Sequence, residues 1–394
     1  MVTQYDLPMA DSVGVVADAA RIGEDIAGPS ADAVDREARF PSETLDALGS
    51  SGLLGALIPT EWGGPGATLP EASQAVTAIS RHCASSGLIF AMHLIQVAYL
   101  ERHGSDAVKH SLFPALLAGD MLLGSANSEV SLEGARRTSI CALEPVEGGY
   151  RLEKQASTVS YGEYTDAILA TARRSPDSPP NEQVLVVCAH PSMELTPTGT
   201  WDTLGLRGTC SRAGLLRSDV PPEFVLGDFA EILARTSLSV GNVLLGSTWV
   251  GIAEAAASSA HASVRADARR SRAADSGGET PLSALRLAEL SVVLQQLREV
   301  IHGGAVEYER VKDTSEVQTL KFTARMDNLK VATSTLAQAV VLQALAICGL
   351  KGYRNDSERS LGRNVRDVLA APLMVNNDRS LQGNAQSLLI RKEL

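Results

Sequence analysis

The chain has 394 residues, 44% of them hydrophobic and only 4% aromatic, and its 35 Lys and Arg against 46 Asp and Glu give a formal net charge of −11. This length predicts two or three domains with sizeable cores, and the apolar content argues against a disordered chain. The acidic balance argues against a general nucleic-acid binder and against a protein held on anionic membranes, because both need basic charge.

The N-terminal residues and the cysteines indicate a cytoplasmic protein. Residues 1–12 lack the basic stretch followed by an apolar stretch that marks a secretory signal. No uninterrupted apolar run reaches the ~18 residues of a membrane span, and the longest candidate, 238–253, carries polar residues and is expected to be a buried helix. The five cysteines show no CxxC spacing, so we expect buried thiols and no metal site.

From about residue 32 to residue 124 the pattern predicts helices. Ser42 follows Phe40 and Pro41 and precedes a leucine-rich segment, so we expect Ser42 to cap the start of a helix. The sequence WGGPG at 62–66 is a dense turn signal. A long apolar helix is predicted over 69–103, with an interruption near Gly87.

The character of the chain changes near Ser125, and the signals are strand-like from there to about Asp228. Residues 166–173 and 183–189 are rich in β-forming side chains and are bounded by Gly, Pro or Ser. The segment 173–183 between them, RRSPDSPPNEQ, is expected to be a surface loop that joins a hairpin. This part of the chain predicts a small β-domain.

Helical periodicity returns at Ser237. A packing seam is predicted from apolar residues at alternating three- and four-residue steps, namely Leu287, Leu290, Leu294, Leu297 and Ile301. An exposed loop is expected over 271–281, and a further long helix over 320–347 that stops at Gly349. We therefore expect an α+β protein with an N-terminal helical domain (1–124), a middle β-domain (125–236) and a C-terminal helical bundle (237–394).

An ordered series of motifs resembles the acyl-CoA dehydrogenase superfamily over about residues 30–390. Residues 40–67 resemble the entry helix of the family and its Tyr/Trp-Gly-Gly-x-Gly turn. Residues 126–139 occupy the place of a Thr-Glu-Pro-Gly-Ala-Gly-Ser loop, and 154–174 resemble the Trp-Ile-Thr-Asn stretch, in register with that loop. Residues 201–211 resemble Leu-Gly-x-Arg-Gly-Ser/Thr, and 347–353 with 366–367 resemble a Gly-rich turn and an Arg-Asp pair. The resemblance implies a middle β-barrel domain and a C-terminal four-helix bundle.

The resemblance also implies a flavoprotein, with FAD between the β-domain and the bundle. The positions that hold the flavin and its pyrophosphate in the family fall on Ser125, Asn127, Ser128, Glu129 and Gly134. The hydroxyl that meets flavin N5 falls on Ser160, which can still donate a hydrogen bond, and the stacking Trp is replaced by Thr158. The alternative is that Ser128 and Ser160 are ordinary loop and strand serines.

The catalytic base of the family is missing from both of its usual positions. The family uses a glutamate to remove the α-proton of an acyl thioester. The usual position, eight residues after the Asp of the Arg-Asp pair, is Val375, and an alternative position early in the first long C-terminal helix is Gly241. Asp378 could supply a carboxylate if its loop is reshaped, but the favoured interpretation of Asn-Asn-Asp at 376–378 is a turn whose side chains cap the backbone.

The family contacts to the ADP half of FAD and to CoA are also altered. The Arg that reaches FAD in a neighbouring subunit falls on Asp267, although Arg265, Arg269 and Arg270 lie near it. The Gln of the Gly-rich turn falls on Ala346, and the Arg that holds CoA falls on Asn242. An anionic pyrophosphate needs positive charge or helix N-termini, so these changes weaken the case for a normally bound ADP half and for free CoA thioesters.

His93 is a further candidate, on the apolar N-terminal helix. Flavin monooxygenases of the same fold use a His from this helix in oxygen chemistry, but dehydrogenases often carry one there too. A lone His on an apolar face is more often a core histidine with its hydrogen bonds satisfied. The other histidines show no metal-ligand spacing.

Three hypotheses follow, of which the first is favoured and the other two are alternatives. The first is a flavoenzyme that oxidises an acyl thioester, carried by CoA or an acyl carrier protein, with electron-transfer flavoprotein as a possible acceptor and a homodimer or homotetramer as the expected assembly. The second is a reduced-flavin-dependent monooxygenase on the same scaffold. The third is a catalytically degenerate subunit of a hetero-oligomeric dehydrogenase.

Overall fold

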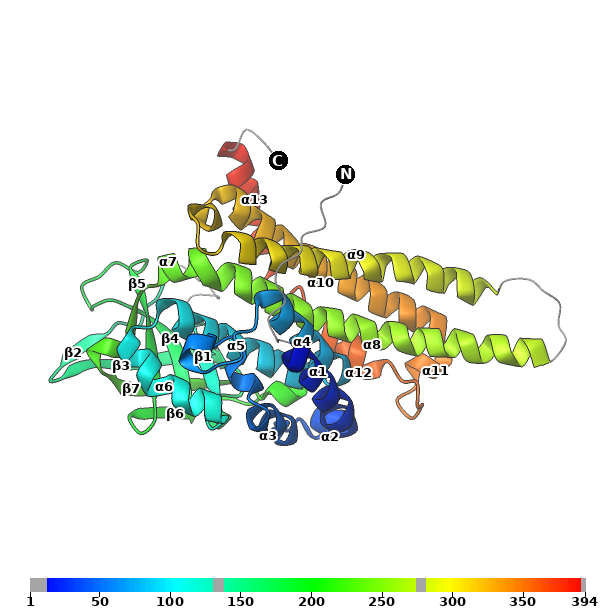
Figure 1. The fold of residues 1–394 in the computed structure, drawn as a ribbon, viewed down its shortest axis with the longest axis horizontal. Helices are drawn as coiled ribbons and strands as arrows, with labels where there is room; N and C mark the ends of the chain where they lie inside the picture. Colours follow the sequence, from blue (N-terminus) through cyan, green and yellow to red (C-terminus); the bar gives the residue numbers. More distant parts are fainter. Residues whose placement is uncertain (1–12, 130–137, 274–280, 391–394) are drawn as a thin grey trace.

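A computed structural model describes residues 13–129, 138–273 and 281–390. Helices come first along the chain, then strands, then long helices, as the sequence predicts (Figure 1). The strands gather at one end of the molecule, and the long C-terminal helices run along its length above the N-terminal helices.

The N-terminal helices enclose the apolar helix α5. They comprise α1 (Val13–Ile22), the π-helical η1 (Gly23–Ala27), α2 (Gly28–Glu37), α3 (Ser42–Ser50), the short 3₁₀ helices η2 (Leu53–Gly55) and η3 (Thr60–Trp62), α4 (Leu69–His82), α5 (Ala84–His103) and α6 (Asp106–Ala118). Nearly every residue of α5 from Ala84 to Leu100 is buried, because the helix is apolar on all sides and packs between α4, α8 and the β-domain.

Two local predictions in this region are wrong in position. Ser42 is the first residue of α3, and Pro41 occupies the N-cap without a side-chain hydrogen bond. The long apolar helix breaks at Cys83, whose backbone is extended, and not at Gly87. A Cβ on Gly87 would lie 1.9 Å from Ser80 Oγ, so this glycine serves the close packing of α5 against α4.

The β-domain contains two four-stranded sheets. The strands are β1 (Leu123–Ala126), β2 (Glu144–Val146), β3 (Gly149–Val159), β4 (Ala167–Arg173), β5 (Gln183–Ala189), β6 (Met193–Pro197), β7 (Arg212–Val220) and β8 (Val225–Asp228), with short 3₁₀ helices η4 (Gly162–Tyr164), η5 (Arg207–Thr209) and η6 (Pro222–Phe224). The sheet orders are β1-β4-β5-β8 and β2-β3-β7-β6.

The predicted hairpin is confirmed, because β4 and β5 pair antiparallel from Ala167–Ala189 to Arg173–Gln183. Inward-facing residues of both sheets, such as Leu152 and Leu216 from one and Ile168 from the other, share a single core. The predicted barrel is therefore resolved as two packed sheets. Strands β1 and β4 pair in parallel, and the other pairs among the strands named above are antiparallel.

The C-terminal bundle consists of long helices that lie side by side (Figure 1). Its elements are α7 (Phe229–Ile232), the π-helical η7 (Leu233–Ser237), α8 (Leu238–Ala273), α9 (Leu282–Val311), the 3₁₀ helix η8 (Ser315–Gln318), α10 (Leu320–Cys348), α11 (Leu350–Tyr353), α12 (Gly362–Val368) and α13 (Asn377–Ile390). The predicted seam is the buried face of α9 from Leu290 to Ile301, and Gly349, with a φ of 58°, ends α10 as predicted.

Helix α10 is long and apolar enough to cross a membrane by length and composition. In its most apolar window, 39% of the residues are buried within the structure. The helix packs against α8, α9 and α13, and a core helix of a bundle has the same composition.

Candidate functional site

Hydroxyl side chains from two segments form a chain just beyond the end of β3. Ser211 Oγ donates to Ser160 Oγ at 2.8 Å and lies 2.8 Å from Thr209 Oγ1. All three residues are buried, Ser160 being 9% exposed. Ser160 has no acceptor for its own hydroxyl hydrogen within the described part of the chain, so this hydrogen is available to a ligand.

The backbone at Tyr161 brings these hydroxyls together. Tyr161 adopts a left-handed φ of 44°, so the chain turns directly after Ser160. Its amide donates to Thr209 O at 2.7 Å, and its buried hydroxyl donates to Leu123 O at 2.9 Å. Burial raises the pKa of Tyr161, which keeps its hydroxyl protonated and able to donate. The two hydrogen bonds of Tyr161 join the ends of β1, β3 and η5.

The segment that follows β1 lies beside the end of β3. Ser128 Oγ donates to Thr158 O at 3.3 Å. Asn127 Oδ1 is buried and has no hydrogen-bond partner among the residues described. Ser125 is half-buried within β1, while Thr158 is exposed. The structure thus gathers Asn127, Ser128, Thr158 and Ser160, which we call the polar cradle.

The polar cradle fits one edge of an isoalloxazine ring, which presents both N–H donors and N or O acceptors. Asn127 offers an unused acceptor, and Ser160 offers an unused hydroxyl hydrogen. A buried polar atom without a partner is rare in a folded protein and needs an explanation such as a ligand. Gly134, the remaining predicted contact, lies outside the described residues.

Glu129 is turned away from the cradle into the β-domain. Its carboxylate accepts from Lys154 Nζ at 2.6 Å and from the Ile140 amide at 2.7 Å, and it also accepts from Ser139 Oγ. Burial alone would raise the pKa of Glu129, but the Lys154 ammonium and the hydrogen bonds from Ser139 and Ile140 together outweigh burial and hold this pKa below its usual value. Glu129 therefore acts as a structural anchor, and the inward-facing Lys154 at an alternating position of β3 is the sequence signal for it.

His93 has both ring nitrogens bound to the backbone. Nδ1 accepts from the Leu123 amide at 3.0 Å, and Nε2 lies 2.8 Å from Leu54 O, which fixes the neutral tautomer with its proton on Nε2. Burial lowers the pKa of His93 to about 4, against the opposing hydrogen bond to Leu54. This geometry supports the core-histidine interpretation, because the ring ties α5 to β1 and η2.

Asp378 lies exposed in the first turn of α13. Its backbone amide donates to Asn376 Oδ1 at 2.8 Å, which is the side-chain capping that the turn interpretation predicts. Asn377 Oδ1 accepts from Lys330 Nζ at 2.5 Å and anchors the turn to α10. Val375 precedes this turn with a left-handed φ of 50°, which is rare for a β-branched residue.

The Arg366-Asp367 pair positions the turn that carries Thr209, a role that the sequence did not reveal. Asp367 Oδ1 accepts from the Leu206 amide at 2.7 Å, and Arg366 pairs with Asp35 on α2. Burial raises the pKa of Asp367 to about 6, although the Leu206 amide opposes this rise. A Cβ on Gly205 would lie 2.4 Å from the Arg366 carbonyl carbon, so the turn and α12 pack backbone to backbone.

Gly241, the alternative position of the base, borders open space although it is buried. A Cβ built on it would meet no heavy atom of the described residues within 4 Å. Its neighbour Asn242, which takes the place of the CoA-binding Arg, is buried and donates to Met326 O at 3.0 Å. The start of α8 therefore borders open space at Gly241 and presents no charge at either position.

The position of the missing FAD-binding arginine carries a carboxylate. Asp267 pairs with Arg270 on α8 and with Lys351 at 3.5 Å on α11. A carboxylate there repels a pyrophosphate, and Ala346 near the end of α10 offers no side-chain hydrogen bond. These positions do not fit the ADP half of FAD in the manner of the family.

Comparison with known proteins gives consistent matches. The sequence profile of the acyl-CoA dehydrogenase N-terminal domain matches residues 15–120, and that of the C-terminal domain matches residues 232–374. A dibenzothiophene monooxygenase from Rhodococcus qingshengii is 28% identical over 67% of each chain. The mitochondrial short-chain specific acyl-CoA dehydrogenase of Bos taurus is 28% identical over 86% of this chain and 80% of its own. The structure of FMN-bound TdsC from Paenibacillus sp. A11-2 superposes with a TM-score of 0.82 at 21% identity, covering 95% of this chain and 97% of that one.

Proposed function

The chain belongs to the acyl-CoA dehydrogenase superfamily, and from that premise we propose that it is a flavin-dependent oxidoreductase that uses reduced flavin and oxygen as a monooxygenase. A flavin supplies hydride or oxygen chemistry when it is bound. The observation that carries the proposal is the retention of the polar cradle together with the loss of both base positions.

The loss of the base separates the two chemistries of the family. Desaturation of a thioester needs a carboxylate to remove the α-proton, and the two positions for it hold Val375 and Gly241. Asp378 lies exposed at the start of α13 and is held in a cap. A monooxygenase needs no base at these positions. The 28% identity to a dibenzothiophene monooxygenase agrees with this function.

The residues of this chain bind and orient the flavin. Ser160 donates its free hydroxyl hydrogen, and Ser211 polarises that hydroxyl by donating to its oxygen. Asn127 accepts through its unpaired Oδ1. Gly241 and Asn242 present no charge to the open space beside Gly241, which suits an apolar substrate.

A thioester dehydrogenase is the second candidate function. The Bos taurus acyl-CoA dehydrogenase matches over 86% of this chain, whereas the Rhodococcus qingshengii monooxygenase matches over 67%. This longer match favours a thioester dehydrogenase. In that case a carboxylate from outside the two usual positions serves as the base, and an acyl carrier protein or electron-transfer flavoprotein becomes the expected partner. A cytoplasmic location and a homo-oligomer remain expectations under either function.

The cofactor contact is tested by flavin titration of two variants. Ser160→Ala removes one donated hydrogen bond and should weaken the binding of FMN by about 3- to 10-fold. Ser157→Ala is the matched control, because Ser157 is half-buried in the same strand and lies outside the cradle. Equal affinities for the two variants would contradict the cradle.

The reaction class is tested by adding butyryl-CoA anaerobically to the protein loaded with oxidised flavin. The proposal predicts an unchanged flavin spectrum. Bleaching of the flavin would overturn the monooxygenase and establish the thioester dehydrogenase. A protein that takes up no flavin at all would instead support a degenerate subunit.

A further inference from the structure

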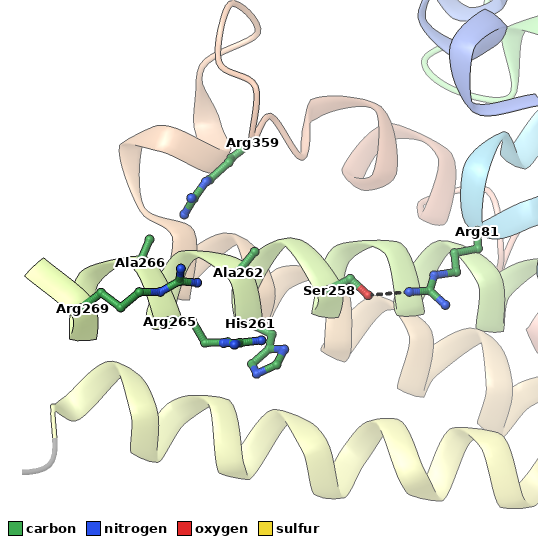
Figure 2. A pocket seen from close by; sticks show the side chains of 8 residues that line it. All are labelled: Arg81, Ser258, His261, Ala262, Arg265, Ala266, Arg269 and Arg359. Carbon is green, nitrogen blue, oxygen red and sulfur yellow. Dashed lines mark hydrogen bonds between the residues drawn. The ribbon is translucent and has the colours of Figure 1, made fainter. Parts of the chain in front are cut away.

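A basic pocket of about 600 Å³ lies along the C-terminal half of α8 and shares no residue with the polar cradle. Arg265 and Arg269 come from α8, Arg81 comes from the end of α4, and Arg359 comes from the turn between α11 and α12. Figure 2 shows the Arg359 side chain pointing from its loop toward the helix that carries Arg265 and Arg269. Ala262 and Ala266 line the pocket between the arginines, where their short side chains leave room.

The pocket concentrates positive charge that no carboxylate of the described residues neutralises by an ion pair. Its lining contains no Asp or Glu. Arg81 donates to Ser258 Oγ at 3.2 Å, and within the described ranges none of the four arginines has a carboxylate partner within 4 Å. Other arginines of this acidic protein do pair, as Arg298 does with Glu254 at 2.6 Å. Four guanidinium groups around one hollow repel one another, so the arrangement calls for an anion.

Arg359 gives the second observation that points to a ligand. Its Nη1 is buried and has no hydrogen-bond partner among the described residues. A guanidinium nitrogen is a charged donor, and leaving such a donor buried and unpaired is unfavourable. Asp267 on α8 does not satisfy this donor, because its carboxylate pairs with Arg270 and Lys351.

We propose that this pocket binds the diphosphate group of a nucleotide. Arginine forks match phosphate oxygens in pairs, and four forks suit a diphosphate better than a single phosphate. The volume lies within the range of small-molecule sites, so there is space for more than an inorganic ion. The residues differ from the positions at which the family holds the ADP half of FAD, where this chain has Asp267 and Ala346.

The test is calorimetric titration of the full chain with sodium pyrophosphate at low ionic strength. Saturable binding at one site per chain is expected. Arg269→Gln should weaken it about ten-fold, the usual effect of losing one charge-assisted pair. Arg270→Gln is the matched control, because it removes the same charge from the next residue, whose guanidinium pairs with Asp267 outside the pocket. Both side chains are exposed, so both variants keep the fold.

The source of the diphosphate is decided by titrating the same variants with FAD, FMN and ADP. If Arg269→Gln weakens FAD but not FMN, the pocket takes the diphosphate of FAD. If it weakens ADP and neither flavin, the ligand is a separate nucleotide. Both results support the pocket. Ser160→Ala should leave pyrophosphate binding unchanged, so a failure of this proposal can be told apart from a failure of the flavin cradle. Absence of saturable pyrophosphate binding, or an equal loss in Arg270→Gln, would overturn it.

Discussion

Removing one partner of the buried ion pair between Lys154 and Glu129 is predicted to destabilise the β-domain strongly. The two side chains are 0% and 6% exposed, and Lys154 Nζ lies 2.6 Å from Glu129 Oε1 and 2.6 Å from Thr171 O. Lys154→Met keeps the length of the side chain and removes the charge. It leaves a buried carboxylate with only neutral donors and the Thr171 carbonyl without its partner, so the expected loss is about 3–5 kcal/mol.

The assay is urea denaturation followed by circular dichroism, with a control in the same strand. Arg151 pairs with Asp219 at 2.9 Å, but both side chains are more than half exposed and screened by solvent, so Arg151→Met should leave the stability nearly unchanged. The double variant Lys154→Met with Glu129→Leu should recover most of the loss, because it removes the uncompensated charge. The reasoning is refuted if Lys154→Met costs no more than Arg151→Met, or if the double variant is as unstable as the sum of the single variants.

The pH dependence of this pair has a defined sign. In the wild type the pKa of Glu129 is held below its ordinary value of 4.5, so its contribution is present above pH 4.5 and is lost as the pH falls through the lower folded pKa. In Lys154→Met no cation opposes burial, so the pKa of Glu129 rises and protonation relieves the buried charge. The stability difference between the two proteins should therefore narrow as the pH falls from 7 to about 4.5.

Three further predictions concern single side chains. His93→Ala leaves the Leu54 carbonyl and the Leu123 amide without partners and should cost about 3–5 kcal/mol in urea denaturation. Because the folded pKa of His93, about 4, lies below the ordinary 6.5, the stability that His93 contributes is lost as the pH falls from about 6.5 to 4. A ring NMR signal of His93 that titrates above pH 6 would contradict this. Gly241→Ala should increase stability by about 1 kcal/mol, since its Cβ meets no described atom within 4 Å and alanine favours a helix. Gly246→Ala should decrease stability, because its Cβ would lie 2.3 Å from a methyl of Ile301. A lower melting temperature for Gly241→Ala than for Gly246→Ala would refute the open space beside Gly241. Asp367→Asn should gain stability relative to the wild type, on the order of 3 kcal/mol, as the pH rises from 3.8 through about 6, because charging the buried carboxyl destabilises only the wild type. A constant difference between the two urea midpoints across this range would disprove it.

The order of helices, strands and long helices was predictable because hydrophobic period and turn residues are local signals. The strands at 167–173 and 183–189, the seam on α9 and the stop at Gly349 all follow from such signals. The break at Cys83 was missed because the sequence marks Gly87, whose small size serves a contact with Ser80 that only the folded packing reveals.

The candidate site was predictable only where a motif fixes a register. The resemblance selects Asn127, Ser128, Thr158 and Ser160, and the fold brings their segments together. It does not reveal that Glu129 turns inward to Lys154, because that depends on which face of β3 is buried. It also does not reveal the role of Asp367, because its partner Leu206 is 161 residues away along the chain.

The reaction of oxygen with the protein loaded with reduced FMN tests the central claim most directly. Rapid mixing of the anaerobic complex with oxygenated buffer, followed by flavin absorbance, compares bound flavin with free flavin. For a monooxygenase built on this cradle, we predict that bound flavin is reoxidised along a time course that differs from that of free flavin. In Ser160→Ala, but not in Ser157→Ala, this time course should move toward that of free flavin. Reoxidation indistinguishable from that of free reduced FMN, at flavin concentrations that saturate the protein, would contradict it.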